Sequence, residues 1–303
     1  MSVESRAIPR ATLYVMFSAC CFGSIPVLII FATRSGARLV DLLAWRYIIA
    51  AAIFVVLSGG IAPLRQVGRR ALPLLVLAGG GQAAVAFVSL SALRYIPSAT
   101  LTFLFYTYPA WVAVTAALRG TERLTGRRVV ALGLSLAGIA LMIGTPSSGG
   151  LHPIGVLLAL ASALLYATYI PLLEHLGRDL PPSVTSVFAT GGAAVVLVAA
   201  TLTQGGPAMR FAPIAWMMIL TLAVVCTVLA FIAFLRGLAT IGPVRTAIVS
   251  TVEPFWAALL GTVVLGQHLG PRTLIGGSLI AAAVVLLQLG VSARPAAAPA
   301  PVA

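Results

Sequence analysis

The chain alternates between long apolar runs and short polar connections from one end to the other. A membrane-spanning helix needs about 20 consecutive apolar residues, and ten runs of about that length can be distinguished. They cover residues 12–33, 39–58, 72–92, 98–118, 127–144, 153–173, 184–203, 213–235, 244–265 and 271–290. Most of the arginines, prolines and glycines fall in or beside the connections, so the pattern predicts an all-α integral membrane protein with ten transmembrane helices.

The composition agrees with this class of protein. Of the 303 residues, 60% are hydrophobic and 8% are charged, whereas soluble chains carry about 25% charged residues. The net charge of +13 comes from arginines scattered between the apolar runs, which is typical of orientation charges in a lipid bilayer and not of a nucleic-acid-binding face. Cys20, Cys21 and Cys226 lie inside apolar runs without metal-ligand spacing, so we expect no metal and no other cofactor.

The arginines are divided unequally between the two predicted sides of the membrane. With a cytoplasmic N-terminus, thirteen arginines fall in cytoplasmic segments and five in outside loops, as the positive-inside rule requires. We therefore expect a multi-pass protein of the cell (inner) membrane with both termini cytoplasmic. Residues 1–11 form the N-terminal segment, and residues 291–303, almost all Ala, Pro and Val, are expected to be a disordered tail.

The two halves of the chain resemble each other when one is shifted by 145 residues. Without any gap, Pro26 falls on Pro171, Pro109 on Pro254 and Trp111 on Trp256. Residues 12–144 and 153–290 thus form two repeats of five spans each. An odd number of spans makes the second repeat enter the membrane with opposite polarity, and such inverted repeats commonly enclose a central cavity beside interrupted helices. The four mid-span prolines mark that interface as candidate hinges.

Glu253 precedes Pro254 in the middle of the ninth run. A charged side chain at the bilayer centre costs about 2.5–3.5 kcal/mol on insertion scales, and proline frees a backbone carbonyl one turn earlier. One interpretation is a neutral Glu253 that is hydrogen-bonded to a neighbouring helix. The other is a cavity-facing carboxyl that binds and releases a proton or a cation, which makes Glu253 the candidate coupling residue.

Other polar and aromatic side chains inside the spans are candidates for substrate binding. Arg46 could face the cavity or extend its guanidinium to the outer interface. Gln82 follows three glycines and could contact a ligand or a neighbouring helix. The aromatic candidates share a position toward mid-span, close to the repeat prolines; they are Tyr106, Tyr108, Trp111, Tyr166, Tyr169 and Trp256.

Three short motifs resemble one family of membrane proteins. Trp45-Arg46-Tyr47 opens the second span, Gly120-Thr121-Glu122-Arg123-Leu124-Thr125 precedes the fifth, and Glu253-Pro254-Phe255-Trp256-Ala257-Ala258 lies in the ninth. Together with the two five-helix halves, they resemble the EamA-type members of the drug/metabolite transporter superfamily. The resemblance implies a ten-helix bundle whose central cavity exports small organic metabolites. The second repeat departs from the pattern, with Gln267 in place of the usual Glu and Gly191 opposite Arg46.

The expected function is secondary transport of a small amphipathic metabolite, with amino acids, including aromatic ones, as the first choice. The expected partners are the small-molecule substrate and the lipid bilayer, with a monomer as the expected unit. A lipid or nucleotide-sugar carrier on the same fold is an alternative, although an anionic substrate would require several cavity cations and only Arg46 offers itself. An intramembrane enzyme would need a nucleophile with its base, or a metal set, within the spans, and neither pattern occurs.

Overall fold

The computed structural model describes residues 3–118, 125–143, 151–177, 179–202 and 205–289, which form helices and connections without any strand. The predicted tail at 291–303 and most of the Gly120–Thr125 element lie outside these residues. The helices of the first half are α1 (Val3–Arg34), α2 (Leu39–Leu57), α3 (Ala62–Gln66), η1 (Gly68–Arg70), α4 (Ala71–Pro73), η2 (Leu74–Ala78), α5 (Gly79–Ser91), η3 (Ala92–Arg94), α6 (Ser98–Phe105), α7 (Tyr108–Leu118) and α8 (Gly126–Ile143). Those of the second half are α9 (Pro153–Leu176), α10 (Pro182–Leu202), α11 (Pro213–Leu220), η5 (Thr221–Leu229), α12 (Ala230–Ser250), α13 (Val252–Leu265) and α14 (Pro271–Leu289).

The helices have the length and surface of membrane spans. Six helical stretches of the described chain are long and apolar enough to cross a bilayer, and three shorter apolar helices lie at 129–142, 252–265 and 271–286. Large apolar side chains point outward along them, among them Val56, Leu157 and Val263, which are 76%, 68% and 72% exposed. Such a surface is stable against lipid tails and not against water. The predicted all-helical membrane fold is confirmed.

Several helices differ from the spans that the sequence predicts. The fourth span, predicted as one helix, is interrupted at residues 106–107 between α6 and α7. The connection predicted at 236–243 is helical and belongs to α12, where Gly237 and Ile241 pack against Ala11 and Val15 of α1. The ninth span therefore begins after a break at Thr251. This packing against α1 is a tertiary effect that the apolar pattern does not contain.

The two interrupted helices stand at equivalent positions of the two repeats. The breaks fall at Tyr106 and Thr251, which are 145 residues apart, and each is followed by a proline, Pro109 or Pro254. Proline has no N–H to give to the carbonyl four residues earlier, so the backbone can leave the helical path there. Pro26 and Pro171, by contrast, lie inside the continuous helices α1 and α9.

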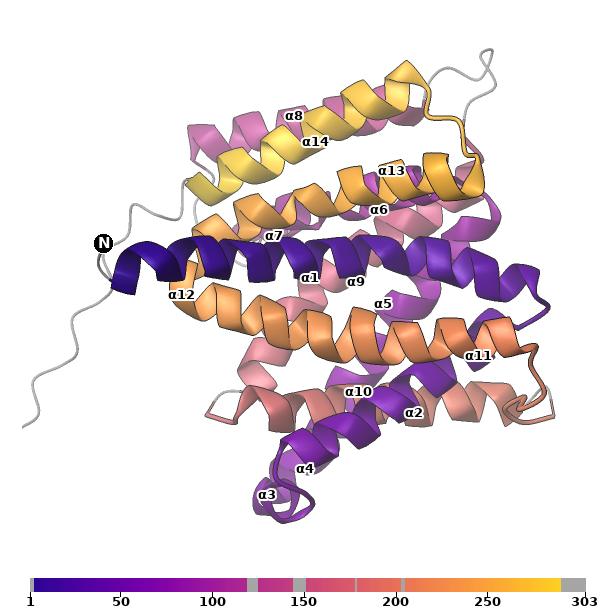
Figure 1. Cartoon of the computed structure of the whole chain (residues 1–303). Helices are drawn as coiled ribbons and strands as arrows, with labels where there is room; N and C mark the ends of the chain where they lie inside the picture. Colours follow the sequence, from indigo (N-terminus) through magenta and orange to yellow (C-terminus); the bar gives the residue numbers. More distant parts are fainter. Residues whose placement is uncertain (1–2, 119–124, 144–150, 178, 203–204, 290–303) are drawn as a thin grey trace, which may run out of the picture.

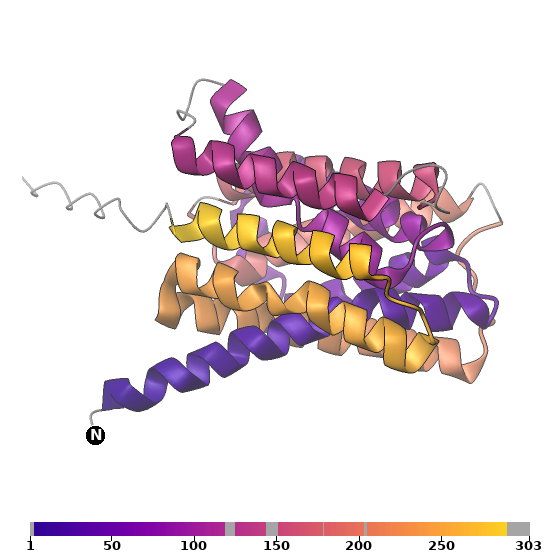
Figure 2. The ribbon, with the colours of Figure 1, turned by 90° about the horizontal axis from the view of Figure 1, so that it is seen from above.

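The packing of the helices follows the same internal symmetry. The second span α2 lies against the seventh span α10, and the fifth span α8 lies alongside the tenth span α14 on one side of the bundle (Figures 1 and 2). The first span α1 packs against α12 and α13, while its counterpart α9 packs against α5, α6 and α7. Each contact thus has its equivalent in the other repeat, as two inverted five-helix repeats require.

Glycines allow the backbones of some helices to touch. A β-carbon at Gly79 of α5 would collide with the backbone of Gly192 in α10. Between α8 and α14, a β-carbon at Gly138 would lie 2.5 Å from the carbonyl oxygen of Gly276, and one at Gly276 would lie 2.6 Å from the carbonyl oxygen of Gly138. Small residues at such crossings are the usual basis of helix association in lipid, because there is little hydrophobic driving force between helices.

An ion pair between the partly exposed Arg38 and the buried Asp41 joins the start of α2 to the loop before α11. Asp41 is fully buried, and its carboxylate accepts hydrogen bonds from Arg38 Nε at 2.5 Å and Nη2 at 2.9 Å. It also accepts the backbone N–H of Ala208 at 3.2 Å, while Arg38 Nη2 donates to the carbonyl of Gly206 at 3.1 Å. The hydrogen bond to Asp41 raises the pKa of Arg38 further above its ordinary value. This cluster joins the two repeats at one end of the second span.

The apolar core is divided into two main clusters. One combines α1, α2, α5, α10, α11 and η5, around side chains such as Leu42, Leu43 and Leu222. The other combines α6, α8, α9, α13 and α14, around side chains such as Phe103 and Ile280. Each cluster mixes spans of both repeats. A central cavity lies between helices of the two clusters and is lined from both.

Candidate functional site

The central cavity has a volume of about 320 Å³ and brings together side chains from α1, α2, α5, α6, α7, α9, α12 and α13. Ligand pockets for small molecules start at roughly 300 Å³, so the cavity suits a small metabolite. It collects seven of the residues that the sequence singled out, namely Pro26, Arg46, Gln82, Tyr106, Tyr108, Tyr166 and Glu253. Their roles in binding, coupling and hinge motion remain predictions.

Arg46 is held inside the bundle and does not extend to the interface. The residue is 6% exposed, and its Nε donates a hydrogen bond of 2.9 Å to Oγ1 of Thr227. The Thr227 hydroxyl in turn donates to the carbonyl of Leu222, five residues earlier in the π-helix η5. The guanidinium carbon also lies 5.3 Å from the ring centre of Tyr47, a cation–π distance. Arg46 is thus oriented by the second repeat.

Gln82 and Tyr47 form a second polar contact on the cavity wall. Gln82 Nε2 donates a hydrogen bond of 2.9 Å to the hydroxyl of Tyr47, which is buried in the apolar core. The amide of Gln82 thus contacts the neighbouring helix α2, and the residue also lines the cavity. Its contact with a ligand stays a prediction. The glycine that precedes it, Gly81, leaves room for the ring of Tyr169 on α9.

Glu253 is joined to the other repeat through Tyr106. The Tyr106 hydroxyl lies 2.8 Å from Glu253 Oε2 and 2.7 Å from the backbone carbonyl oxygen of Ser250. Ser250 stands four residues before Pro254, so its carbonyl is the one that the proline leaves without a helical donor. Tyr106 is the residue at the break between α6 and α7. The two interrupted helices therefore contact each other at the cavity wall, where the first supplies the Tyr106 side chain and the second supplies the Ser250 carbonyl and the Glu253 carboxyl.

Aromatic rings form the rest of this wall. The ring centres of Tyr108 and Tyr166 are 4.9 Å apart in an edge-to-face arrangement, and Phe105 lies 5.2 Å from Tyr166. Tyr106 and Tyr108 are 6.1 Å apart. Such pairs contribute roughly 0.5–1.5 kcal/mol beyond their buried area. The cavity thus presents aromatic faces with one guanidinium and one carboxyl, and no ion pair joins Arg46 to Glu253.

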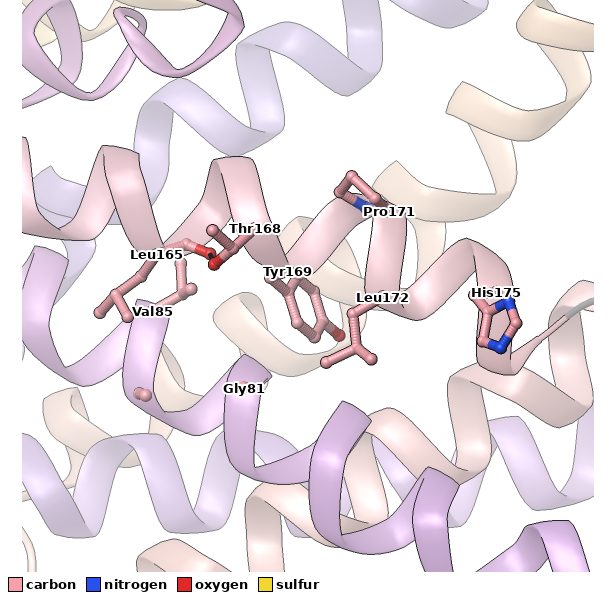
Figure 3. A pocket seen from close by; sticks show the side chains of 9 residues that line it. Gly81, Val85, Leu165, Thr168, Tyr169, Pro171, Leu172 and His175 are labelled. Carbon is pink, nitrogen blue, oxygen red and sulfur yellow. Dashed lines mark hydrogen bonds between the residues drawn. The ribbon is translucent and has the colours of Figure 1, made fainter. Parts of the chain in front are cut away.

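Three predicted binding residues lie elsewhere. Tyr169 is 4% exposed and lines a second hollow of about 430 Å³ between α5 and α9, beside Gly81 and with His175 at its far end (Figure 3). Trp256 Nε1 donates a hydrogen bond of 3.0 Å to Oγ of Ser24, which ties α13 to α1. Trp111, in α7, is half-buried and belongs to the lining of neither hollow.

Several lining residues were not predicted. Tyr47 is the last residue of Trp45-Arg46-Tyr47, and its position beside Arg46 is the only sequence signal that could have indicated it. The others lie in apolar runs, where nothing distinguishes a cavity-facing side chain from a packed one; they include Phe22, Ser89, Thr102, Phe105, Phe231 and Phe234. Within the described part of the chain, no three His, Cys, Asp or Glu side chains converge as a metal site would require.

Two interlocked five-helix repeats around a polar and aromatic cavity define a polytopic membrane protein with the architecture of a secondary transporter. The chain belongs to the EamA-like transporter family, whose model matches residues 9–144 and again residues 153–289. The resemblance seen in the sequence motifs is confirmed, and the two matches coincide with the two repeats.

Similar proteins agree with this assignment. The chain is 24% identical over 281 residues to the uncharacterized transporter YcbK of Bacillus subtilis, covering 89% of this chain and 90% of that protein. It is 29% identical over 223 residues to an uncharacterized transporter of Archaeoglobus fulgidus, covering 74% and 78%. The protein PecM of Dickeya dadantii is 26% identical over 245 residues, covering 78% and 79%. A solved structure titled "Crystal structure of protein" has a TM-score of 0.64 at 21% identity and covers 93% of this chain and 97% of its own, which supports the fold.

Proposed function

We propose that this transporter moves small zwitterionic metabolites out of the cell, with aromatic and large apolar amino acids as the first choice. The observation that carries the proposal is that one guanidinium and one carboxyl line the same aromatic cavity. Arg46 and Glu253 line it from different repeats without bonding to each other. The carboxylate of a zwitterionic substrate would bind the Arg46 guanidinium, and its ammonium would bind the Glu253 carboxyl. The tyrosine rings would pack against an apolar substrate side chain.

The alternating-access movement would run between the two apolar clusters that flank the cavity. Each cluster packs within itself, and the break between α12 and α13 separates a helix of the first cluster from one of the second. In transporters with inverted repeats, one bundle rocks against the other around a fixed midplane site. Transport by this route needs no cofactor.

A nucleotide-sugar carrier on the same fold is less well supported. Phosphate groups are usually bound by several arginines or lysines, and Arg46 is the single cation among the residues that line the cavity. The outward-facing leucines beside the second hollow, Leu165 and Leu172, border lipid in any span and do not by themselves favour a lipid substrate. Amino acids therefore remain the first class to test.

The test uses the purified protein in proteoliposomes with a panel of labelled substrates. Arg46→Gln should raise the KM for zwitterionic substrates tenfold or more, because a hydrogen bond to a charged group contributes about 1.5–3 kcal/mol. Arg94→Gln is the matched control, since Arg94 is exposed at the end of η3. Efflux of tryptophan or leucine that is no faster from these vesicles than from protein-free vesicles, with uptake of another substrate class, would overturn the proposal.

The aromatic wall is tested in the same assay. Tyr166→Ala removes a ring from the central cavity, whereas Tyr169→Ala removes one from the second hollow. The first variant should weaken transport of aromatic substrates more than transport of alanine. Equal losses for both substrates in Tyr166→Ala would contradict an aromatic substrate site.

A further inference from the structure

The hydroxyl of Tyr106 stands between two oxygens and has a single hydrogen. The carbonyl oxygen of Ser250 lies 2.7 Å away and Oε2 of Glu253 lies 2.8 Å away, both within hydrogen-bond distance. A carbonyl oxygen cannot donate, and a carboxylate cannot donate either. The two short contacts are therefore both hydrogen bonds only if the third group, the carboxyl of Glu253, supplies a second hydrogen.

The direction of the Tyr106 hydrogen is constrained by the break in the ninth span. Pro254 leaves the Ser250 carbonyl without its helical donor, and a polar backbone group that is unsatisfied inside a bilayer costs several kcal/mol. The Tyr106 hydroxyl is the donor that reaches this carbonyl. When it donates there, its own oxygen can accept, and a protonated Glu253 completes a chain from carboxyl to hydroxyl to carbonyl.

Among the residues whose side chains the structure describes, neither a second acid nor a directly bonded cation faces Glu253. On α1, Gly23 faces the start of α13 and has no side chain. The backbones approach so closely that a β-carbon at this position would lie 2.6 Å from the backbone carbonyl oxygen of Glu253. The other ionisable side chains described around the cavity are phenols and one guanidinium. They are Arg46 and Tyr47 on α2, Tyr106 and Tyr108 at the α6–α7 break, and Tyr166 on α9. Arg46 is engaged by Thr227 and forms no ion pair with Glu253.

We propose that Glu253 is a proton-binding site, that it is loaded in this conformation, and that its proton links the two interrupted helices. The inference rests on the proposed transport function and makes the proton the coupling ion. On release, the proton passes from Glu253 Oε2 to cavity water and leaves a carboxylate. The Tyr106 O–H then turns from Ser250 to this carboxylate, and the Ser250 carbonyl loses its donor. The contact between the α12–α13 break and the α6–α7 break is thereby weakened.

The repeat predicts the number of protons. The position equivalent to Glu253 in the first repeat is occupied by Tyr108, a phenol that stays protonated near neutral pH. The α6–α7 break therefore has no acid of its own. One titrating carboxyl serves both interrupted helices, so one proton should move for each substrate molecule.

The first test separates exchange from accumulation in proteoliposomes. Wild-type protein should exchange labelled for unlabelled substrate without a pH gradient and accumulate it against a concentration gradient when a pH gradient is imposed. Glu253→Gln keeps the size and hydrogen bonding but cannot titrate, so an imposed pH gradient should no longer drive accumulation. Exchange should continue with a higher KM, because the substrate ammonium loses its carboxylate partner. Tyr95→Phe is the control, since Tyr95 is exposed, packs against His152 and lines neither hollow. If Glu253→Gln accumulates substrate as well as wild type, the proposal is overturned. If wild-type protein exchanges no amino acid at all, the proposed function fails instead.

The second test reads the carboxyl group directly and holds even if Glu253→Gln transports nothing. Infrared difference spectra between high and low pH should contain the C=O stretch of a protonated carboxyl that disappears in Glu253→Gln. The same band should shift in frequency in Tyr106→Phe, because the carboxyl loses its acceptor, and stay unchanged in Tyr95→Phe. A pH-sensitive dye should report about one proton exchanged per substrate bound by wild type and none by Glu253→Gln. A spectrum without a band from Glu253, or one that Tyr106→Phe leaves unchanged, contradicts the proposed link.

Discussion

The side-chain oxygen of Gln267 accepts two hydrogen bonds from Ser98, one from its backbone N–H at 3.2 Å and one from its hydroxyl at 2.8 Å. Ser98 begins α6, and the first N–H groups of a helix have no carbonyl partner within it. A residue of the second repeat thus caps an interrupted helix of the first. In the sequence, Gln267 departs from the family pattern, which usually has Glu at this position. The glutamine keeps the oxygen that accepts the hydrogen bonds from Ser98 but carries no charge.

Gln267→Leu should lower the stability of the protein. Ser98 is buried, so the variant leaves a buried donor unsatisfied, at a cost of about 1–3 kcal/mol. Gln267→Glu should retain most of the stability because a carboxylate accepts the same hydrogen bonds. Thermal unfolding of the detergent-purified protein measures both, with His268→Leu at the exposed neighbouring position as the control. A Tm of Gln267→Leu equal to that of the control would show that the cap contributes nothing.

Gly79→Ala should lower the Tm and Gly80→Ala should not, although the two glycines are neighbours. A β-carbon at Gly79 meets the backbone of Gly192, whereas one at Gly80 has nothing within 4 Å. Forcing a methyl group into a packed contact costs typically 1–3 kcal/mol, so Gly79→Ala should lower the Tm. Gly80→Ala should keep or raise it, since alanine favours a helix over glycine. Equal Tm values for the two variants would contradict the backbone contact between α5 and α10.

Asp41→Asn should destabilise the protein more than Asp179→Asn. Asp41 is buried and accepts hydrogen bonds from Arg38 and from the backbone of Ala208, whereas Asp179 is exposed. A guanidinium stays charged at every working pH, so Arg38 keeps its need for the carboxylate. Asparagine tolerates the positive φ of 67° at residue 179, so the control introduces no strain. Thermal unfolding at neutral pH compares the two, and equal losses would contradict the role of the cluster.

The predicted orientation can be checked by cysteine labelling. Gln66 lies in a segment expected on the cytoplasmic side and Met209 in one expected outside, and both are exposed. In a variant whose three native cysteines are replaced by alanine, a membrane-impermeant maleimide added to intact cells should label Met209→Cys and not Gln66→Cys. Inside-out vesicles should give the reverse result. Labelling of both residues from the same side would refute the ten-span topology.

The number of spans and the repeat could be predicted because they depend on properties that the sequence contains directly. Apolar runs of bilayer length determine the spans, and the 145-residue offset aligned Pro109 with Pro254. Those prolines also lie beside the two helix breaks, since a missing N–H has the same local effect in any packing. The break after Phe105 and the helix across 236–243 were not predicted, because both depend on which neighbouring helix the segment contacts.

The cavity could be predicted only in part, for a physical reason. A span that is apolar on all sides carries no periodic signal for the face that lines a cavity, so only its rare polar residues could be selected. Arg46, Gln82 and Glu253 line the cavity together. Tyr169 and Trp256, chosen because they are aromatic and near mid-span, face other partners, and Phe231 and Phe234 were indistinguishable from core residues.

The contact between α8 and α14 also bears on the origin of the molecule. Gly138 and Gly276 approach each other reciprocally, and their partners at the 145-residue offset, Ala283 and Ala131, are both completely buried. The surface is therefore its own complement when one copy is turned upside down against another, as in an isologous dimer interface. A chain of five spans that carries this surface can pair with an oppositely inserted copy of itself, so a single gene fusion suffices to join the two orientations in one chain.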